Sequence, residues 1–198
     1  MPIRQHGADR PRRRLLLLLG VLLALALVVA APALRVAPAS FYLLLANVPG
    51  APAGPFSRLL GRPTVRSWRF TGAEGQVVAD VYVPRGGGVH PTILIVNGAL
   101  STGRAYPPLA QFGAALAQSG YTAVIPDYPD LLKEILSPAS LTDVEFTLQH
   151  LNAVPGVDGR RLEVVGFCVG ATLGMLAAED PRMPTLRAVV ALSGYVSS

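Results

Sequence analysis

Short apolar stretches recur along the chain from Pro63 onward, and their pattern predicts strands. Gln76–Pro84 alternates apolar and polar positions, as in a strand with one buried face, whereas Thr92–Val96 is continuously apolar and β-branched, as in a strand buried on both faces. Proline, glycine or polar residues separate such stretches from one another. The remaining strands predicted in this way are Tyr121–Pro126, Leu162–Phe167 and Arg187–Leu192.

Apolar residues at helical spacing lie between these strands and predict helices over Pro107–Gln118, Ser140–Val154 and Thr172–Glu179. Gly120 closes the first helix, and Ser140 or Thr142 is the expected N-cap of the second. Strands separated by single helices indicate parallel pairing with right-handed crossovers. The predicted fold class is therefore α/β, a mostly parallel sheet with helices on both faces.

A longer apolar run near the N-terminus predicts a transmembrane helix. In Leu15–Leu34, 18 of 20 residues are apolar and none is charged. A helix of about 20 residues spans the hydrocarbon core of a bilayer. Residues 1–14 carry five arginines and one aspartate, which predicts that this basic segment stays cytoplasmic while the rest crosses. We expect a signal anchor, with a cleaved signal peptide ending at Ala31-Pro32-Ala33 as the alternative.

Either form exports the remainder of the chain. The protein is thus predicted to be single-pass in a membrane with its C-terminal domain extracytoplasmic, or secreted if the leader is cleaved. Residues 35–62 are interrupted by proline and glycine and form a predicted linker, whose apolar stretch Phe41–Val48 is too short to span a membrane. Residues 63–198 are the predicted domain.

Charge and composition exclude two classes of protein. The formal net charge of +5 comes from the N-terminal region, because 11 basic and 11 acidic residues cancel from residue 51 onward. Nucleic-acid binding needs Lys and Arg clustered on the folded domain, so no nucleic-acid partner is expected. Disorder is excluded because 51% of the residues are apolar and only 15% are charged.

Candidate chemistry centres on Gly166-Phe167-Cys168-Val169-Gly170, between a predicted strand and a predicted helix. This is a G-x-nucleophile-x-G elbow with cysteine in the place of the commoner serine. A strained turn presents the nucleophile at the edge of the sheet, the glycines permit close backbone approach, and the helix N-terminus favours the thiolate. The amide of Val169 would face a developing oxyanion. The alternative is an inert structural cysteine whose thiol stays protonated.

With this elbow the sequence resembles the α/β-hydrolases and, among them, the dienelactone hydrolase family, whose elbow carries cysteine. The resemblance covers residues 64–198 and implies that a loop amide of Gly98 or Ala99 is the second donor to the oxyanion. Asp127 lies near the site but is expected to form a turn. The segments that carry the resemblance are Thr92–Val96 with Asn97-Gly98-Ala99, Gly120-Tyr121 with Val124-Ile125-Pro126-Asp127, and Val157-Asp158 through Gly170.

The resemblance leaves two parts of the family pattern unmatched. In the family an acid and then a histidine follow the nucleophile, but no histidine follows Cys168, and the three present are His6, His90 and His150. We expect His150 on a helix face and Asp180 in a turn at a helix end. The carboxylate that the family places beside the resting thiol is also not evident near the loop after Thr92–Val96.

Two hypotheses follow. The first is a membrane-anchored hydrolase of small-molecule carboxylic ester, lactone or thioester substrates, with Cys168 as nucleophile and the acid and histidine absent from this chain. The sheet would then be incomplete, lacking its last two strands and exposing a hydrophobic edge. The second is a catalytically inactive anchored scaffold that binds an apolar ligand or a protein partner. No motif implies a metal or an organic cofactor, and the single cysteine excludes an internal disulfide.

Overall fold

The computed structural model describes residues 62–193. The predicted basic segment 1–14, the predicted membrane segment 15–34 and all but the last residue of the predicted linker 35–62 lie outside the described residues. Within residues 62–193, no helix combines the length and the apolar character needed to cross a bilayer.

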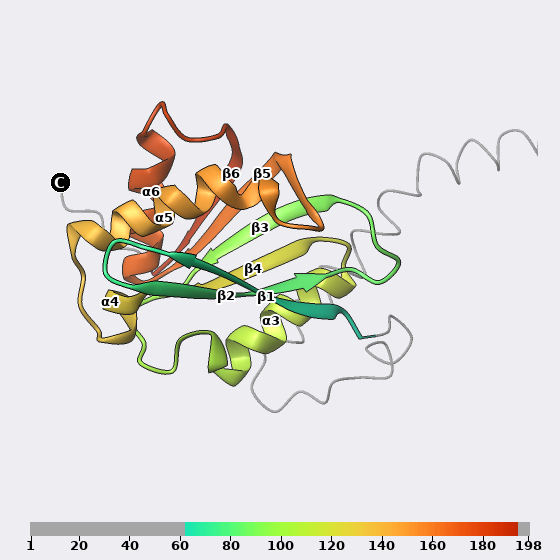
Figure 1. Ribbon diagram of the computed structural model, residues 1–198, viewed down its shortest axis with the longest axis horizontal. Helices are drawn as coiled ribbons and strands as arrows, with labels where there is room; N and C mark the ends of the chain where they lie inside the picture. Colours follow the sequence, from blue (N-terminus) through green and yellow to red (C-terminus); the bar gives the residue numbers. More distant parts are fainter. Residues whose placement is uncertain (1–61, 194–198) are drawn as a thin grey trace, which may run out of the picture. The chain divides into compact units, whose positions relative to one another are not determined.

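A mixed sheet of six strands forms the centre of the described domain (Figure 1). The spatial order is β1-β2-β4-β3-β5-β6; β2 pairs antiparallel with both β1 and β4, and the other pairs are parallel. The α/β class with a mostly parallel sheet is confirmed. The strands are β1 Thr64–Thr71, β2 Gln76–Val83, β3 His90–Val96, β4 Thr122–Asp127, β5 Val157–Phe167 and β6 Leu186–Leu192.

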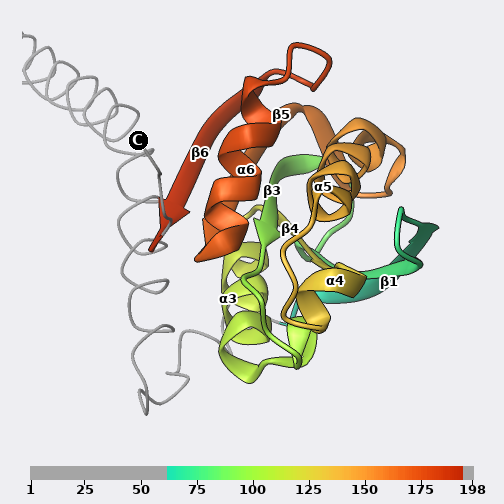
Figure 2. The same cartoon turned by 90° about the vertical axis from the view of Figure 1, so that its left-hand side faces the viewer.

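Helices cover both faces of this sheet. Figure 2 shows α3 (Pro107–Gln118) on one side, and α5 (Pro138–His150) and α6 (Val169–Glu179) on the other. A single-turn helix, α4 (Pro129–Leu132), and two short 3-10 helices, η1 (Gly103–Ala105) and η2 (Leu151–Ala153), lie in the connections.

Alternation along the strands divides the core into two layers. In β3, Leu94 belongs to the cluster beneath α5 and α6, whereas Ile93 and Ile95 belong to the cluster beneath α3. Successive side chains of a strand point to opposite faces, so a strand buried on both faces must be apolar at every position. This is the physical reason why the central strands read as continuous apolar runs.

The helix bounds correct two predictions. The N-cap of α5 is Ser137, not Ser140 or Thr142: its hydroxyl accepts the Ser140 amide, and the Ser140 hydroxyl accepts the Ser137 amide. Pro138 then occupies the first helical position, where its missing N–H costs nothing. The last helix begins at Val169 rather than Thr172, directly after the elbow.

Two elements and part of a third were missed. β1 was not predicted, because five of its first six residues are exposed and it lacks an apolar run. The single turn α4 is too short to show a helical period. β5 begins at Val157 rather than Leu162, because Val157 and Asp158 already pair with β3 before an irregularity in the ladder.

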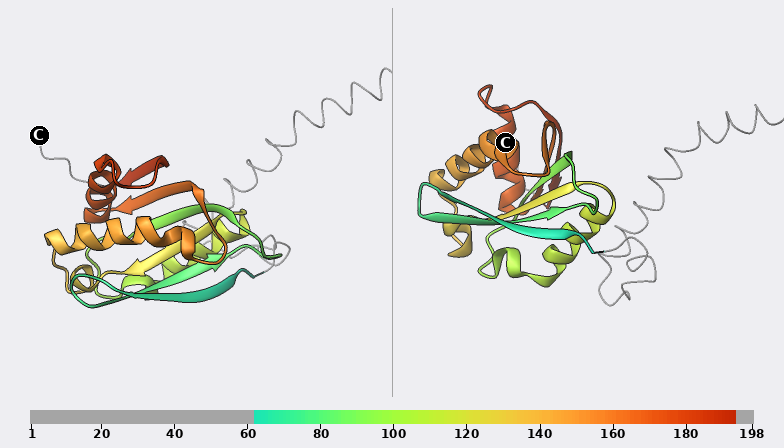
Figure 3. Two further views of the ribbon diagram at one scale, coloured as in Figure 1. Left: turned by 45° about the horizontal axis from the view of Figure 1, so that its top comes forward. Right: turned by 45° about the vertical axis from the view of Figure 1, so that its right-hand side comes forward.

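The two edges of the sheet differ in chemistry. β1 carries the charged residues Arg66 and Arg69, which discourage pairing with another strand. β6 forms the opposite edge of the described sheet (Figure 3), and its residues Val190 and Leu192 are 44% and 42% exposed. Leu176 of the neighbouring α6 is 45% exposed as well. The edge strand β6 of the described sheet therefore exposes apolar side chains.

Candidate active site

The carboxyl ends of β3 and β5 bring two segments together. The strands pair in parallel with Val96 opposite Gly166, so the chain leaves both strands at the same edge of the sheet. A β-carbon added to Gly98 would lie 3.2 Å from Cys168 Cβ and 3.2 Å from the carbonyl oxygen of Phe167. The loop after β3 and the turn after β5 therefore lie in contact.

Cys168 occupies a strained turn between β5 and α6. Its backbone has φ 51° and ψ −124°, a conformation that favours glycine. Such a conformation costs about 1–3 kcal/mol and persists only where the surroundings enforce it. Here the Cys168 amide donates to the carbonyl of Leu192 at 2.9 Å, and the Ala171 amide donates to the carbonyl of Cys168 at 3.0 Å. The side chain of Cys168 is left exposed at the edge of the sheet.

The two glycines of the elbow stand where no side chain fits. A β-carbon on Gly166 would lie 2.3 Å from Ala171 Cα, and one on Gly170 would lie 2.3 Å from the Val96 carbonyl oxygen and 2.4 Å from that of Asn97. Real β-carbons essentially never come closer than 3.0 Å to such atoms. Gly166 thus permits β5 to approach α6, and Gly170 permits α6 to approach the end of β3.

Backbone amides suited to an oxyanion lie on both segments. Val169 is the first residue of α6, and the first N–H groups of a helix have no acceptor within it. The partial positive charge of the helix N-terminus lies at the same place. On the other segment, Ala99 is exposed, and its amide donates no hydrogen bond within the described part of the chain.

Gly98, the other residue predicted for the second amide, is already engaged. Its N–H donates to Asn97 Oδ1 at 2.9 Å. A buried amide left without a partner would cost about 1–3 kcal/mol, so the carboxamide of Asn97 satisfies a real requirement of this loop. Of the two amides, that of Gly98 has an acceptor and that of Ala99 has none among residues 62–193.

The described histidines lie near the amino ends of the parallel strands, whereas Cys168 lies at their carboxyl ends. His90 begins the seven-residue strand β3, so it is about 20 Å from the edge where β3 ends. Its Nε2 lies 2.9 Å from the carbonyl oxygen of Gly87. His150 ends α5 just before η2 and β5; its ring stacks on Phe146 at 3.9 Å between centroids, as expected for a residue on a helix face. Neither histidine is placed to act on the thiol.

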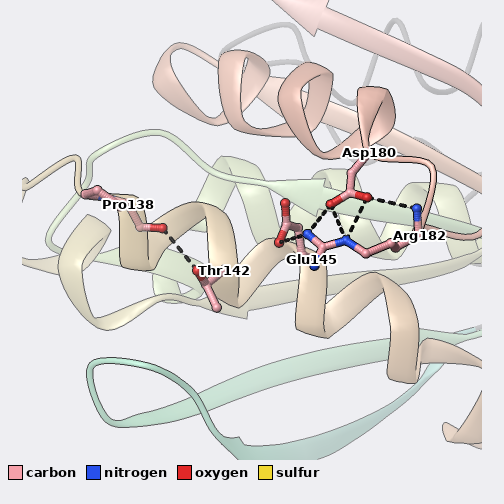
Figure 4. Close-up of polar contacts among 5 residues, drawn as sticks. All are labelled: Pro138, Thr142, Glu145, Asp180 and Arg182. Carbon is pink, nitrogen blue, oxygen red and sulfur yellow. Dashed lines mark hydrogen bonds and ion pairs between the residues drawn. The ribbon is translucent and has the colours of Figure 1, made fainter.

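Asp180 also has a structural role in the described domain. Its carboxylate accepts the backbone amide of Arg182 at 2.8 Å and the Nε of the same residue at 3.0 Å. Figure 4 shows this pair together with Glu145, whose carboxylate lies 4.0 Å from the Arg182 guanidinium. The hydrogen bonds from Arg182 lower the pKa of Asp180 to about 2. Asp180 thus closes the turn after α6 and orients no histidine.

Asp127 is tied to Arg104 in the loop after β3. One carboxylate oxygen accepts the Arg104 amide at 2.6 Å, and the other forms an ion pair with its guanidinium. Arg104 Nε lies 3.1 Å from an oxygen of Asp80 on β2. Burial acts to lower the pKa of Arg104, but the two carboxylates outweigh it and raise that pKa. Asp127 therefore fastens the loop, in agreement with the structural role expected for it.

No group of three or more His, Cys, Asp or Glu side chains within residues 62–193 is arranged to hold a metal ion. A pocket of about 10 Å³ lies between the loop after β3 and α4, with Asn97, Gly98, Leu100 and Leu131 among its lining residues. That volume is about the space of a single water molecule.

The model of the dienelactone hydrolase family matches residues 128–198, which include the whole elbow. Over these residues the chain is similar to the dienelactone hydrolase family. No curated protein matched the chain in sequence.

Solved structures extend the likeness in fold. A candidate dienelactone hydrolase from Klebsiella pneumoniae is 25% identical with TM-score 0.51, covering 68% of this chain and 62% of its own. A dienelactone hydrolase-like promiscuous phosphotriesterase from metagenomic libraries is 22% identical with TM-score 0.56, covering 68% and 60%. A hyperthermophilic esterase from Pyrobaculum calidifontis is 22% identical with TM-score 0.55, covering 71% and 48%. The chain thus spans less than two thirds of the length of each.

Sequence reasoning missed the role of one residue at this site. The sequence places Asn97 in the loop after Thr92–Val96 but predicts no role for its side chain. The signal was present, since an asparagine followed by glycine in a loop commonly hydrogen-bonds nearby backbone. Which amide it would hold could not be read without the backbone path of the loop.

Proposed function

We propose that the dienelactone hydrolase-like domain hydrolyses carboxylic ester, lactone or thioester bonds of small molecules with Cys168 as the nucleophile. The observation that carries the proposal is the positive φ of Cys168 on a turn that contacts the loop after β3. Strain of this kind clusters at active sites because it presents a reactive side chain at a fixed position. An inert structural cysteine would have no need of an exposed, strained turn.

The reaction proposed has two steps. The thiolate of Cys168 attacks the carbonyl carbon, the carbonyl π electrons move to oxygen, and the amides of Val169 and Ala99 hold the resulting oxyanion. Collapse of the tetrahedral intermediate expels the alkoxide or thiolate, which takes up a proton, and leaves a thioester on Cys168. Water then attacks this thioester and releases the carboxylic acid and the free cysteine.

The proposal assigns the general base to a histidine, oriented by an acid, outside the described residues. A cysteine is partly ionised at neutral pH and attacks with less help than a serine needs. Loss of a triad's base nevertheless removes most of the rate. Acylation of Cys168 by an activated ester is therefore the step to measure.

The test is acylation by p-nitrophenyl acetate, followed as release of p-nitrophenolate and by peptide mapping of the acetyl group. Because the sequence holds a single cysteine, thiol labelling reports on Cys168 alone. Cys168→Ala should abolish the reaction, whereas Ser119→Ala, on the opposite edge after α3, should leave it unchanged. Unaltered release by Cys168→Ala would refute the proposal. An absence of acylation in every variant, with ligand binding insensitive to Cys168→Ala, would favour the scaffold hypothesis.

We propose in addition that residues 15–34 anchor the domain to a membrane, with residues 1–14 in the cytoplasm and the domain outside. The support is the uncharged apolar run behind five arginines. Alkaline extraction of membranes from expressing cells should leave the full chain in the pellet, and external protease should reach the domain. Recovery of a shortened chain in the medium would instead indicate a cleaved signal peptide.

A further inference from the structure

Asn97 contacts both halves of the candidate site. Its Oδ1 accepts the Gly98 amide at 2.9 Å, on the residue that lies against Cys168. Its carbonyl oxygen lies under Gly170, 2.4 Å from where a β-carbon would be. The backbone of Asn97 therefore contacts the elbow at Gly170, and its side chain binds the backbone of the loop at Gly98.

We propose that Asn97 is a positioning residue, whose carboxamide holds the Gly98 amide so that the next amide, that of Ala99, is the one presented to the oxyanion. This inference rests on the proposed function of Cys168. It concerns which of two amides, that of Gly98 or that of Ala99, donates to the oxyanion, and which contact determines this.

The need for such a hold follows from the residue that is held. Gly98 is buried and has no side chain, so steric contacts restrain its backbone less than that of any other residue. Rotation about this glycine would turn the Ala99 amide as well. The hydrogen bond that the Gly98 N–H donates to the Asn97 side chain fixes the peptide plane between these two residues, and the Ala99 amide is placed from that plane.

The other end of the carboxamide supports the same orientation. Asn97 Nδ2 is buried and has no partner among the described residues, and Asn97 lines the pocket of about 10 Å³ beside α4. If the amide group were flipped, Nδ2 would meet the Gly98 N–H donor to donor, so the observed orientation is the one that the loop requires.

The test compares two reactions of Cys168 that differ in their need for an oxyanion hole. Acylation by p-nitrophenyl acetate passes through an oxyanion, whereas alkylation by iodoacetamide does not, and both depend on the thiolate. The ratio of the two rates therefore reports the oxyanion hole alone. Asn97→Leu and Asn97→Ala should lower this ratio by about 10- to 100-fold, within or below the effect of removing an oxyanion donor outright. Ser101→Ala, an exposed change in the same loop, should leave it unchanged.

The outcomes separate this inference from the proposed function. If wild-type Cys168 is not acylated, the proposed function fails. If it is acylated and the ratio in Asn97→Leu and Asn97→Ala stays at the wild-type value, or both rates fall together, the positioning role is refuted. Hydrogen exchange in the wild-type chain needs no variant: the Gly98 amide should be protected and the Ala99 amide should exchange rapidly, and the reverse order would overturn the inference.

Discussion

Replacement of Gly170 by alanine is the sharpest test of how the elbow is built. The new β-carbon would lie 2.3 Å from the Val96 carbonyl oxygen, 0.7 Å short of the 3.0 Å that such atoms require. The opposing atoms belong to the backbone of β3 and its loop, so no side chain can rotate away. Either α6 or the end of β3 must move by most of that distance.

The expected cost follows from this displacement. Overpacking of a well-packed site costs about 1–3 kcal/mol in the free energy of unfolding, and the gain in helix propensity of up to about 1 kcal/mol offsets part of it. The same movement separates the Ala99 loop from Cys168. A misplacement approaching 1 Å can lower a rate by about 100-fold, so acylation of Cys168 should fall by that order while the chain still folds.

Urea unfolding and the acylation rate of Cys168 measure the two effects. Gly174→Ala is the comparison on the same helix, because its β-carbon would meet side-chain rather than backbone atoms, with Val164 Cγ1 nearest at 2.8 Å. That variant should unfold within about 1 kcal/mol of wild type and keep its acylation rate. If Gly170→Ala were as stable and as reactive as Gly174→Ala, the inference that α6 lies in close contact with the end of β3 at Gly170 would be refuted.

Three further predictions concern stability and association. Burial raises the pKa of the Asp143 carboxyl, although the hydrogen bond from the Ala73 amide opposes this shift. Ionisation of Asp143 therefore destabilises the fold as pH rises through that pKa. Asp143→Asn should be more stable than wild type in urea at pH 7 and should lose this advantage below about pH 4. Ser137→Ala should destabilise the domain by about 1 kcal/mol in thermal unfolding through loss of the α5 cap, whereas Thr142→Ala should stay within about 0.5 kcal/mol. Val190→Lys should weaken concentration-dependent association in sedimentation velocity, because a lysine protects an edge strand; equal association in both proteins would contradict an exposed β6 edge.

Much of the fold could be predicted because strong local patterns specify it. The bounds of α3 agree with the predicted helix Pro107–Gln118 at both ends, since proline opens it and glycine follows it. The start of α5 could not be placed in the same way. Ser137, Ser140 and Thr142 all have side chains that can cap a helix, and only the backbone path selects Ser137. β1 could not be predicted from the sequence, because an edge strand with one half-buried face needs few apolar residues.

The same distinction between local pattern and tertiary structure holds for the candidate site. The G-x-C-x-G spacing by itself determined that Cys168 would lie on a tight turn between a strand and a helix, because only glycine tolerates backbone contact on both sides of such a turn. The sequence also determined that β3 and β5 would pair in a parallel sheet, since single helices separate the predicted strands. Tertiary structure alone decided that the Gly98 amide has an acceptor while that of Ala99 has none among the described residues, and that His90 and His150 lie at the strand ends away from Cys168. Those facts depend on strand order and register, which join residues about 70 positions apart through hydrogen bonds that no local pattern encodes.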